Sequence, residues 1–194
     1  MSSVNEEQPK YNNQRNQELK ELLAACALND RSAFARLYQL TSAKLYGVVL
    51  HILNREATAQ ECLQDAYIKI WNKAESYRTH LAAPMTWMTT IARNQALDHL
   101  RRRQREVMES DGYSFIEQID TQPLPLQFCS HSKEKTQLMA CLDQLNENQR
   151  QMISLAYFRG LTHSELASRT NTPIGTVKTQ IRRGLEQLRG CLET

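Results

Sequence analysis

Close to the C-terminus, four cationic or hydroxyl side chains recur at helical spacing on one side of a predicted helix over residues 173–192. They are Lys178, Thr179, Arg182 and Arg183. The other side is an apolar seam made of Ile174, Val177, Ile181, Leu185, Leu188 and Leu192. A helix in the major groove of DNA needs this division, because one face rests on its scaffold while the other reaches bases and phosphates. The pattern favours DNA contact over the alternative, a solvated helix in a bundle.

The residues before this helix are typical of a helix-turn-helix. Thr162-His-Ser-Glu165 forms a capping box for a predicted helix over 162–170. Asn171 tolerates the left-handed backbone of a tight turn, and Pro173 suits the first turn of the next helix. A turn of two or three residues between two helices is the spacing of DNA-reading pairs. Gly175 would let a phosphate backbone come close.

A second basic segment lies in a predicted helix over residues 84–107. It combines Trp87 and Asn94 with the arginine-rich stretch Arg101–Arg105. Aromatic stacking and amide hydrogen bonds both suit unpaired bases, so this helix is a candidate surface for a single strand. The alternatives are that Trp87 belongs to the core and that the arginines form a solvated helix end favoured by the helix dipole.

The most regular helical pattern covers residues 57–74. Its apolar residues recur every three or four positions, which predicts one buried face. Ile68 lies off this stripe, among polar neighbours. A single exposed Ile is ordinary in a folded protein, but it can also mark a surface for a partner.

Charge is unevenly distributed along the 194 residues, whose formal net charge is +3. Residues 1–105 carry 15 Lys/Arg and 10 Asp/Glu, residues 106–137 carry 2 and 6, and residues 138–194 carry 7 and 5. Two basic blocks separated by an acidic one suit two modules that contact one polyanion through an acidic connector.

Several functional classes are disfavoured. The chain shows neither a secretory leader nor an apolar run that could cross a membrane, so we expect a cytoplasmic protein. It also has no glycine loop that could cradle phosphate, no His-Glu-x-x-His and no paired Cys-x-x-Cys. We therefore predict no cofactor, no metal site and no enzymatic activity.

The helical periods, together with only 6 Gly and 5 Pro, predict an all-α protein. We expect two small helical domains joined by a flexible acidic linker. The expected boundaries are a disordered leader over 1–16, a first domain over 17–107, the linker over 108–132 and a second domain over 133–194.

In their order and separation, these motifs resemble those of bacterial extracytoplasmic-function (ECF) sigma factors, the small promoter-recognition subunits of RNA polymerase. In the first domain the resemblance rests on Asp65-Ala-Tyr-Ile-Lys-Ile-Trp71 and on the segment from Trp87 to Arg103. In the second domain it rests on Leu145-Asn-Glu-Asn-Gln-Arg150, Gly160-Leu-Thr-His-Ser-Glu165 and Thr172-Pro-Ile-Gly-Thr-Val-Lys-Thr179. The resemblance implies that the first domain is sigma region 2 and the second is sigma region 4, a helix-turn-helix.

The resemblance also implies partners and roles. Core RNA polymerase would bind Gln64, Asp65, Ile68 and Trp71. The promoter −10 element would be bound through a loop over 77–85 that captures flipped bases, and by Arg78, Trp87, Asn94, Arg101 and Arg102. The −35 element would be read by Gly175, Thr176, Lys178, Thr179, Arg182 and Arg183. Family members are commonly held inactive by an anti-sigma factor, often a membrane-bound one, so we expect such a partner.

Five cysteines in a cytoplasmic chain do not indicate a disulfide framework. Cys26 and Cys62 occupy apolar helix positions and are expected in the core. Cys141 and Cys191 fall in the first and last predicted helices of the second domain. If those helices pack side by side, the two sulfurs could meet as a reversible redox pair that changes the hold on an inhibitor. The alternative is two small buried hydrophobes.

The main alternative to a sigma factor is a stand-alone helix-turn-helix regulator, possibly redox-responsive through Cys141 and Cys191. A regulator of that class would not need the predicted helices over 57–74 and 84–107, so these helices favour the sigma factor. A redox-responsive interaction protein is a third interpretation. An enzyme is the weakest, because no constellation of residues supports one.

Overall fold

The computed structural model describes residues 7–111 and 132–192. Within these ranges the chain forms eight α-helices and one short 3-10 helix, and no strand, which confirms the predicted all-α class. The chain divides into two compact units, residues 1–115 and 116–194. Most of the predicted leader (1–6) and of the predicted linker (112–131) lies outside the described residues.

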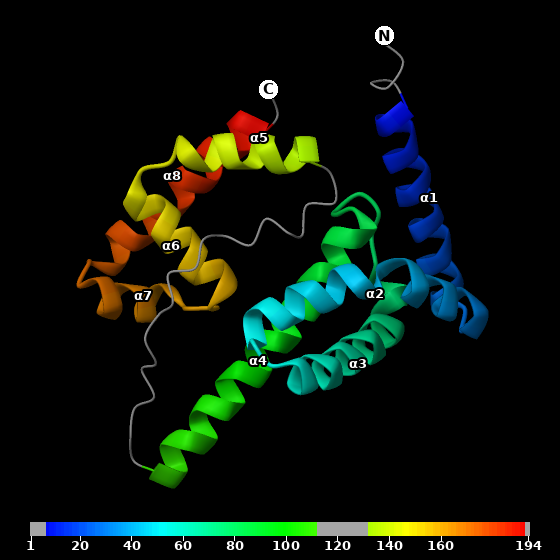
Figure 1. Ribbon diagram of the computed structural model, residues 1–194, viewed down its shortest axis with the longest axis horizontal. Coiled ribbons are helices and arrows are strands. Elements are labelled where there is room, and N and C mark those ends of the chain that lie inside the picture. Colours follow the sequence, from blue (N-terminus) through cyan, green and yellow to red (C-terminus); the bar gives the residue numbers. More distant parts are fainter. Residues whose placement is uncertain (1–6, 112–131, 193–194) are drawn as a thin grey trace. The chain divides into compact units, whose positions relative to one another are not determined.

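The first unit is built from α1 (Glu7–Ala27), α2 (Arg31–Leu53), α3 (Glu56–Lys73), η1 (Ala74–Ser76) and α4 (Pro84–Asp111). Helices α2, α3 and α4 pack against one another, and α1 packs against α2 (Figure 1). Their shared core contains the fully buried side chains Leu19, Leu23, Leu37, Leu45, Val49, Ile70 and Met88. Burial of these apolar side chains supplies the main driving force for assembling the unit.

Polar residues determine where α2 begins and ends. Asp30 is the N-cap, and its carboxylate accepts hydrogen bonds from the backbone N–H groups of Ser32 and Ala33 at 2.8 and 3.1 Å. The Ser32 hydroxyl, followed by these two N–H groups, holds the pKa of Asp30 below its ordinary value. Asn54 ends the helix with a left-handed backbone, at φ 52°.

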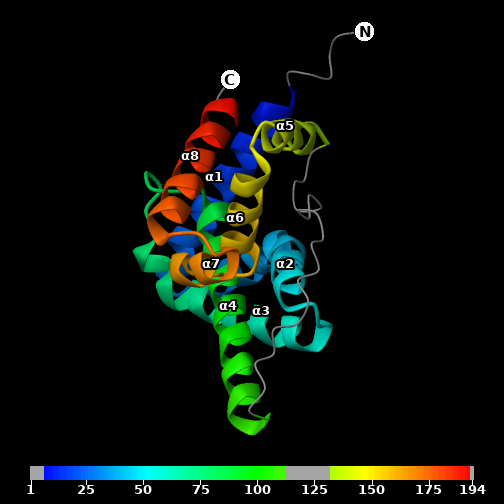
Figure 2. The same ribbon diagram turned by 90° about the vertical axis from the view of Figure 1, so that its left-hand side faces the viewer.

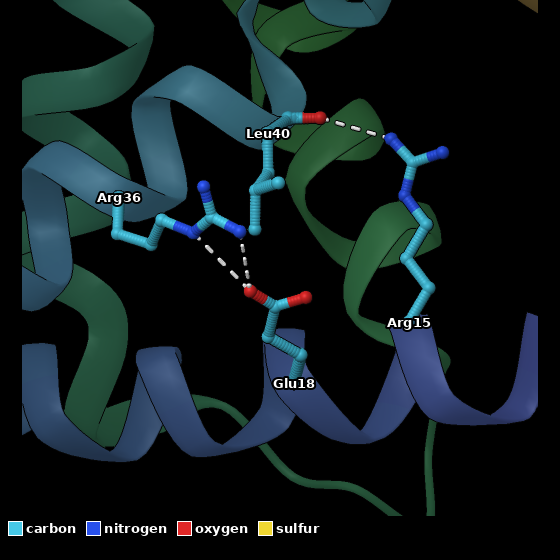
Figure 3. A network of polar contacts seen from close by, with 4 residues as sticks. All are labelled: Arg15, Glu18, Arg36 and Leu40. Atoms are coloured by element: carbon cyan, nitrogen blue, oxygen red, sulfur yellow. Dashed lines mark hydrogen bonds and ion pairs between the residues drawn. The ribbon is translucent and has the colours of Figure 1, made fainter.

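Helix α1 begins at Glu7, so the expectation that residues up to 16 form a disordered leader is wrong for residues 7–16. Extending an established helix gains one hydrogen bond for each residue fixed, so a helix anchored by its apolar side can continue into a polar segment. A polar contact from Arg15 also holds this part, and a second contact lies one turn further along α1 (Figure 3). Arg15 Nη2 donates to the carbonyl of Leu40 at 2.9 Å, and Arg36 pairs with Glu18 at 3.1 Å.

The second unit contains α5 (Ser132–Asp143), α6 (Glu147–Phe158), α7 (His163–Thr170) and α8 (Ile174–Leu192). Helices α6 and α8 lie side by side in both views, and α7 packs against each of them (Figures 1 and 2). The expected capping box of Thr162 with Glu165 is present, and a second one joins Asn146 with Gln149. Asn171 has the expected left-handed backbone. The core of this unit contains Met152, Leu155, Leu166, Val177 and Ile181.

The apolar seam of α8 is narrower than its sequence pattern predicts. Ile174, Leu185 and Leu192 are 44%, 51% and 43% exposed, so their predicted burial is wrong. Gly184 is buried instead, because α6 comes close at that point. A Cβ atom on Gly184 would lie 2.7 Å from Ile153 Cδ1. The close approach of α6 fixes which side of α8 is covered and leaves the flank with these three residues outside.

Among the described helices, none is both long enough and apolar enough to cross a membrane.

Candidate nucleic-acid and partner-binding surfaces

Three residues with complementary side chains share one face of α4. Trp87, Asn94 and Arg101 are seven residues apart, which places them on the same side of an α-helix. Asn94 and Arg101 are exposed. Trp87 is half-buried, with its ring centroid 5.3 Å from that of Tyr77. The face therefore offers an aromatic ring, an amide and a cation in succession, which suits an unpaired strand.

The loop before α4 is held by hydrogen bonds to its own backbone. Tyr77 Oη donates to the carbonyl of Ala82 at 2.9 Å, and Leu81 N donates to the carbonyl of Arg78 at 3.1 Å. Arg78 Nη1 donates to the carbonyls of Glu75 and Tyr77 at 2.7 and 3.0 Å. The guanidinium of Arg78 therefore organises the loop from within, although the side chain is exposed enough to meet a phosphate as well.

This ordered loop displays an apolar residue that the sequence reasoning missed. Leu81 is 76% exposed. Its type carried no signal, because a single leucine in a predicted loop is not distinguishable from any other surface leucine. Its exposure is known only from the turn in which its backbone N–H donates to the carbonyl of Arg78, in the loop directly before α4.

Four arginines lie in the C-terminal part of α4. Arg101, Arg102, Arg103 and Arg105 are all exposed. In both views the C-terminal part of α4 extends past α2 and α3 (Figures 1 and 2). These exposed arginines are candidates for contact with a polyanion.

The candidate polymerase-binding residues occupy α3. Gln64, Asp65 and Ile68 are exposed, and Ile68 is 58% accessible, as its place off the apolar stripe predicts. Trp71 is only half-buried, and its ring packs edge-on against Phe34 with centroids 5.0 Å apart. The structure thus brings an exposed apolar residue and two polar residues together on α3. Trp71 is only partly exposed beside them, because its ring packs on Phe34.

Asp65 also has a role inside the unit. Its Oδ2 accepts a hydrogen bond from Gln95 Nε2 at 3.1 Å and lies 3.2 Å from His99 Nε2. Gln95 is nearly buried. Asp65 therefore joins α3 to α4, the helix that carries the candidate DNA-binding face.

The candidate −35 residues lie on the outward side of α8. Gly175, Thr176, Lys178, Arg182 and Arg183 are exposed, and Thr179 is half-buried. Thr179 Oγ1 donates to the carbonyl of Gly175 at 2.8 Å, and Arg182 pairs with Glu186 at 3.2 Å within the helix. A Cβ atom on Gly175 would meet nothing within 4 Å. No packing requirement within the unit therefore explains a glycine at this position.

Cys141 and Cys191 form a disulfide that joins α5 to the end of α8, with Cα atoms 5.8 Å apart. A second contact ties the same helix, because Gln187 Nε2 donates to the carbonyl of Gln144 at 2.9 Å. Of the two alternatives weighed for this pair, the structure contains the bonded one. Reversible use of the bond stays a prediction.

The other described cysteines lie in the core, as expected. Burial raises the pKa of Cys26 to about 11 and that of Cys62 to about 12, so both thiols are inert near neutral pH. Across residues 7–111 and 132–192, no group of three or more His, Cys, Asp or Glu side chains could hold a metal ion.

Comparisons with known proteins agree with this architecture. Residues 37–106 match the family model of sigma-70 region 2, and residues 135–188 match that of sigma-70 region 4. The ECF RNA polymerase sigma factor SigK of Mycobacterium ulcerans is 31% identical over 179 residues, which is 92% of this chain and 96% of the relative. SigK of Mycolicibacterium vanbaalenii is 31% identical over 90% of this chain and 89% of its own. Rhodobacter sphaeroides SigE, in complex with the anti-sigma ChrR, aligns at a TM-score of 0.45 with 33% identity, over 90% of this chain and 98% of that one.

The two family-model matches define a two-domain promoter-recognition subunit of the sigma-70 class, with region 2 in the first unit and region 4 in the second. The chain belongs to the family of ECF RNA polymerase sigma factors. It acts in transcription initiation, where a sigma factor binds core RNA polymerase and directs it to promoters. The stand-alone regulator is not favoured, since region 2 has no place in it.

Proposed function

We propose that the first unit binds unpaired bases of the −10 element through α4 and the loop before it. The observation that carries this assignment is the alignment of Trp87, Asn94 and Arg101 on one face of α4. The adjacent loop supports it, because its backbone is held by Tyr77 and Arg78 while Leu81 points outward. A loop ordered before binding loses less conformational freedom when a base docks on it.

Strand opening by such a surface needs no catalytic residue. Unstacking and unpairing a base costs a few kcal/mol, and contacts made only with the extruded base offset this cost. Arg101 and Arg102 would hold the phosphates nearby, which fixes register without reading sequence. The polymerase performs the chemistry, and the sigma factor itself is not an enzyme.

The second unit is assigned to the −35 element. Helix α8 is held by α6, by α7 and by the disulfide, while its opposite side carries Lys178, Arg182 and Arg183. These long cationic side chains suit phosphates and guanine edges in the major groove. Gly175 and Thr176 lie at the start of the helix, where the absence of a large side chain lets the DNA backbone approach closely.

Core polymerase is assigned to the outward side of α3. Ile68 is the expected anchor, because an exposed apolar side chain beside Gln64 and Asp65 gains the most from being covered. Asp65 is partly engaged by Gln95 and His99, so a polymerase contact there would act on a carboxylate already fixed in position.

Membership in the family also supports a cytoplasmic protein that is held inactive by an anti-sigma factor. Purifying this protein from cells together with what is bound to it would identify the inhibitor. The sequence of that inhibitor would then show whether it is membrane-bound.

The test is run-off transcription with purified core polymerase, this protein and a pooled genomic template. Discrete new transcripts that share two upstream elements are the expected result, and they would also identify the promoter. Failure to bind core polymerase, with duplex binding retained, would refute the proposal. An Asn94→Ala variant that transcribes normally would refute the −10 assignment alone.

A further inference from the structure

Two neighbouring residues on the exposed side of α4 are joined by a side-chain hydrogen bond. Arg93 Nη1 donates to Asn94 Oδ1 at 3.2 Å. Asn94 is exposed and Arg93 is half-buried. The contact matters because Asn94 is the residue of this face whose side chain can both donate to a base and accept from it.

The chemistry of arginine decides which way the amide of Asn94 turns. A guanidinium has only donors, so it can face the amide oxygen but not the amide nitrogen. With Oδ1 turned toward Arg93, Nδ2 is the other end of the amide, and its two N–H bonds can donate to a ligand. The hydroxyl of Thr90, one turn earlier, already donates to the carbonyl of Thr86 at 2.8 Å.

The next amide along the helix is used differently. Gln95 is nearly buried and its Nε2 donates to Asp65 Oδ2, so it faces α3 rather than the ligand side. Of these two adjacent amides, one therefore holds the unit together and the other is available outside. The orientation of the available amide depends on Arg93.

We propose that Arg93 is a positioning residue that fixes the hydrogen-bonding polarity of Asn94, so that the amide presents the two N–H donors of Nδ2 to a ligand. The inference rests on the proposed binding of unpaired −10 bases. Two amide N–H donors fit a base edge with neighbouring acceptors, such as N7 and O6 of guanine or N3 and O2 of cytosine. This orientation disfavours adenine, whose bidentate pairing with asparagine needs one donor and one acceptor from the amide.

The experiment measures base preference directly. Core polymerase carrying the full-length protein is incubated with single-stranded DNA dodecamers of random sequence, and the bound strands are sequenced. The informative position is the one whose preference disappears in Asn94→Ala. There, the wild type should disfavour adenine relative to guanine and cytosine by about tenfold.

Three substitutions of Arg93 separate polarity from mere packing. Arg93→Lys also has only donors, so it should keep the wild-type preference. Arg93→Met releases Oδ1 and should bring adenine to within about twofold of guanine, since the amide is then free to turn. Arg93→Glu can only accept, so it should turn Oδ1 outward and favour the amino groups of adenine and cytosine. The measured quantity is the ratio of the bases that one variant binds at the informative position. A general loss of affinity from the changed charge affects all bases equally and cancels in this ratio.

The outcomes distinguish this inference from the function on which it rests. A position that responds to Asn94→Ala but keeps its preference in Arg93→Met and Arg93→Glu would overturn the inference and leave the −10 assignment intact. If no position responds to Asn94→Ala, Asn94 reads no base and both fail. Loss of core polymerase binding in Arg93→Met would show that Arg93 supports the fold, and would also overturn the inference.

Discussion

Thr41 of α2 and Tyr67 of α3 share a hydrogen bond inside the first unit, with 2.6 Å between Oγ1 and Oη. Thr41 Oγ1 also donates to the carbonyl of Leu37 at 2.7 Å, so the phenol of Tyr67 is the donor between the helices. Thr41 is completely buried and Tyr67 is 3% exposed. A polar pair in this position is favourable only while both members are present.

We therefore expect Thr41→Val to destabilise the first unit by about 1–3 kcal/mol, because it leaves the buried phenol of Tyr67 without an acceptor. The double variant Thr41→Val/Tyr67→Phe should be more stable than Thr41→Val alone. Urea unfolding of all four proteins of this cycle measures the coupling. Independent, additive losses would contradict the assigned bond.

Stability should also depend on Tyr67 at high pH. Burial raises the pKa of Tyr67 to about 12, above its ordinary value near 10. Between these values the unfolded chain releases the proton while the folded chain keeps it, so this contribution is complete below pH 10 and is lost as pH rises to about 12. We expect the wild type to lose roughly 2 to 3 kcal/mol relative to Tyr67→Phe over that window. Parallel curves of stability against pH would exclude the shift. The buried thiols of Cys26 and Cys62 also titrate at high pH, but they are common to both proteins, so their effect cancels in the comparison.

Gly184→Ala should destabilise the second unit by about 1–3 kcal/mol, although alanine is the better helix former. The new Cβ would lie 2.7 Å from Ile153 Cδ1 and 3.3 Å from Gln149 Cβ. Ile153→Val removes the nearer atom, so the double variant should recover part of the loss. Gly175→Ala is the matched control: nothing lies within 4 Å of its Cβ position, and thermal unfolding should show a gain of about 0.5–1 kcal/mol.

The double variant Lys178→Ala/Arg182→Ala should abolish transcription that depends on the −35 element while leaving core polymerase binding intact. These two exposed cations lie on the outward side of α8. Loss of two phosphate or base contacts should also reduce the salt dependence of duplex binding. Arg31→Ala/Arg55→Ala removes the same charge from exposed positions in the first unit and serves as the control. Normal transcription from the first double variant would refute the assigned face.

The disulfide should stabilise the second unit, because it links cysteines 50 residues apart in sequence. The chain-entropy model gives about 4 kcal/mol for a loop of this length, and measured values are commonly 2–4 kcal/mol. Cys141→Ser/Cys191→Ser should therefore lower the stability of this unit and match the wild type treated with a reductant. Unfolding of the first unit should not change. Promoter output of the double variant under oxidant, compared with that of the wild type, tests the predicted reversible use.

Most helix ends could be predicted from the sequence because local chemistry decides them. Asn146, Thr162 and Asn171 each act through backbone groups within four residues, so no distant contact is needed to place them. The exposure of Ile68 was also predictable, since the apolar stripe of α3 is regular enough to show which residue departs from it.

The sequence could not predict which side chains at the edge of an apolar face are buried, because this depends on which neighbouring helix covers them. Periodicity places Leu185 near the apolar side of α8, but only the approach of α6 at Gly184 decides that Leu185 stays outside. The hydrogen bonds of Arg78 to its own loop and of Asp65 to Gln95 are likewise invisible in the residue types. Each joins groups whose separation is known only once the chain has folded.

The bond between Cys141 and Cys191 turns the segment that carries α6, α7 and most of α8 into a covalent ring. A protease that cuts once within the ring would leave both fragments attached, and they would separate on a gel only after reduction. The second unit could therefore be nicked in the turn between α7 and α8 and still remain one molecule. The ring also offers a route to a split protein, in which the two fragments of the unit are made separately and joined by oxidation of the two cysteines.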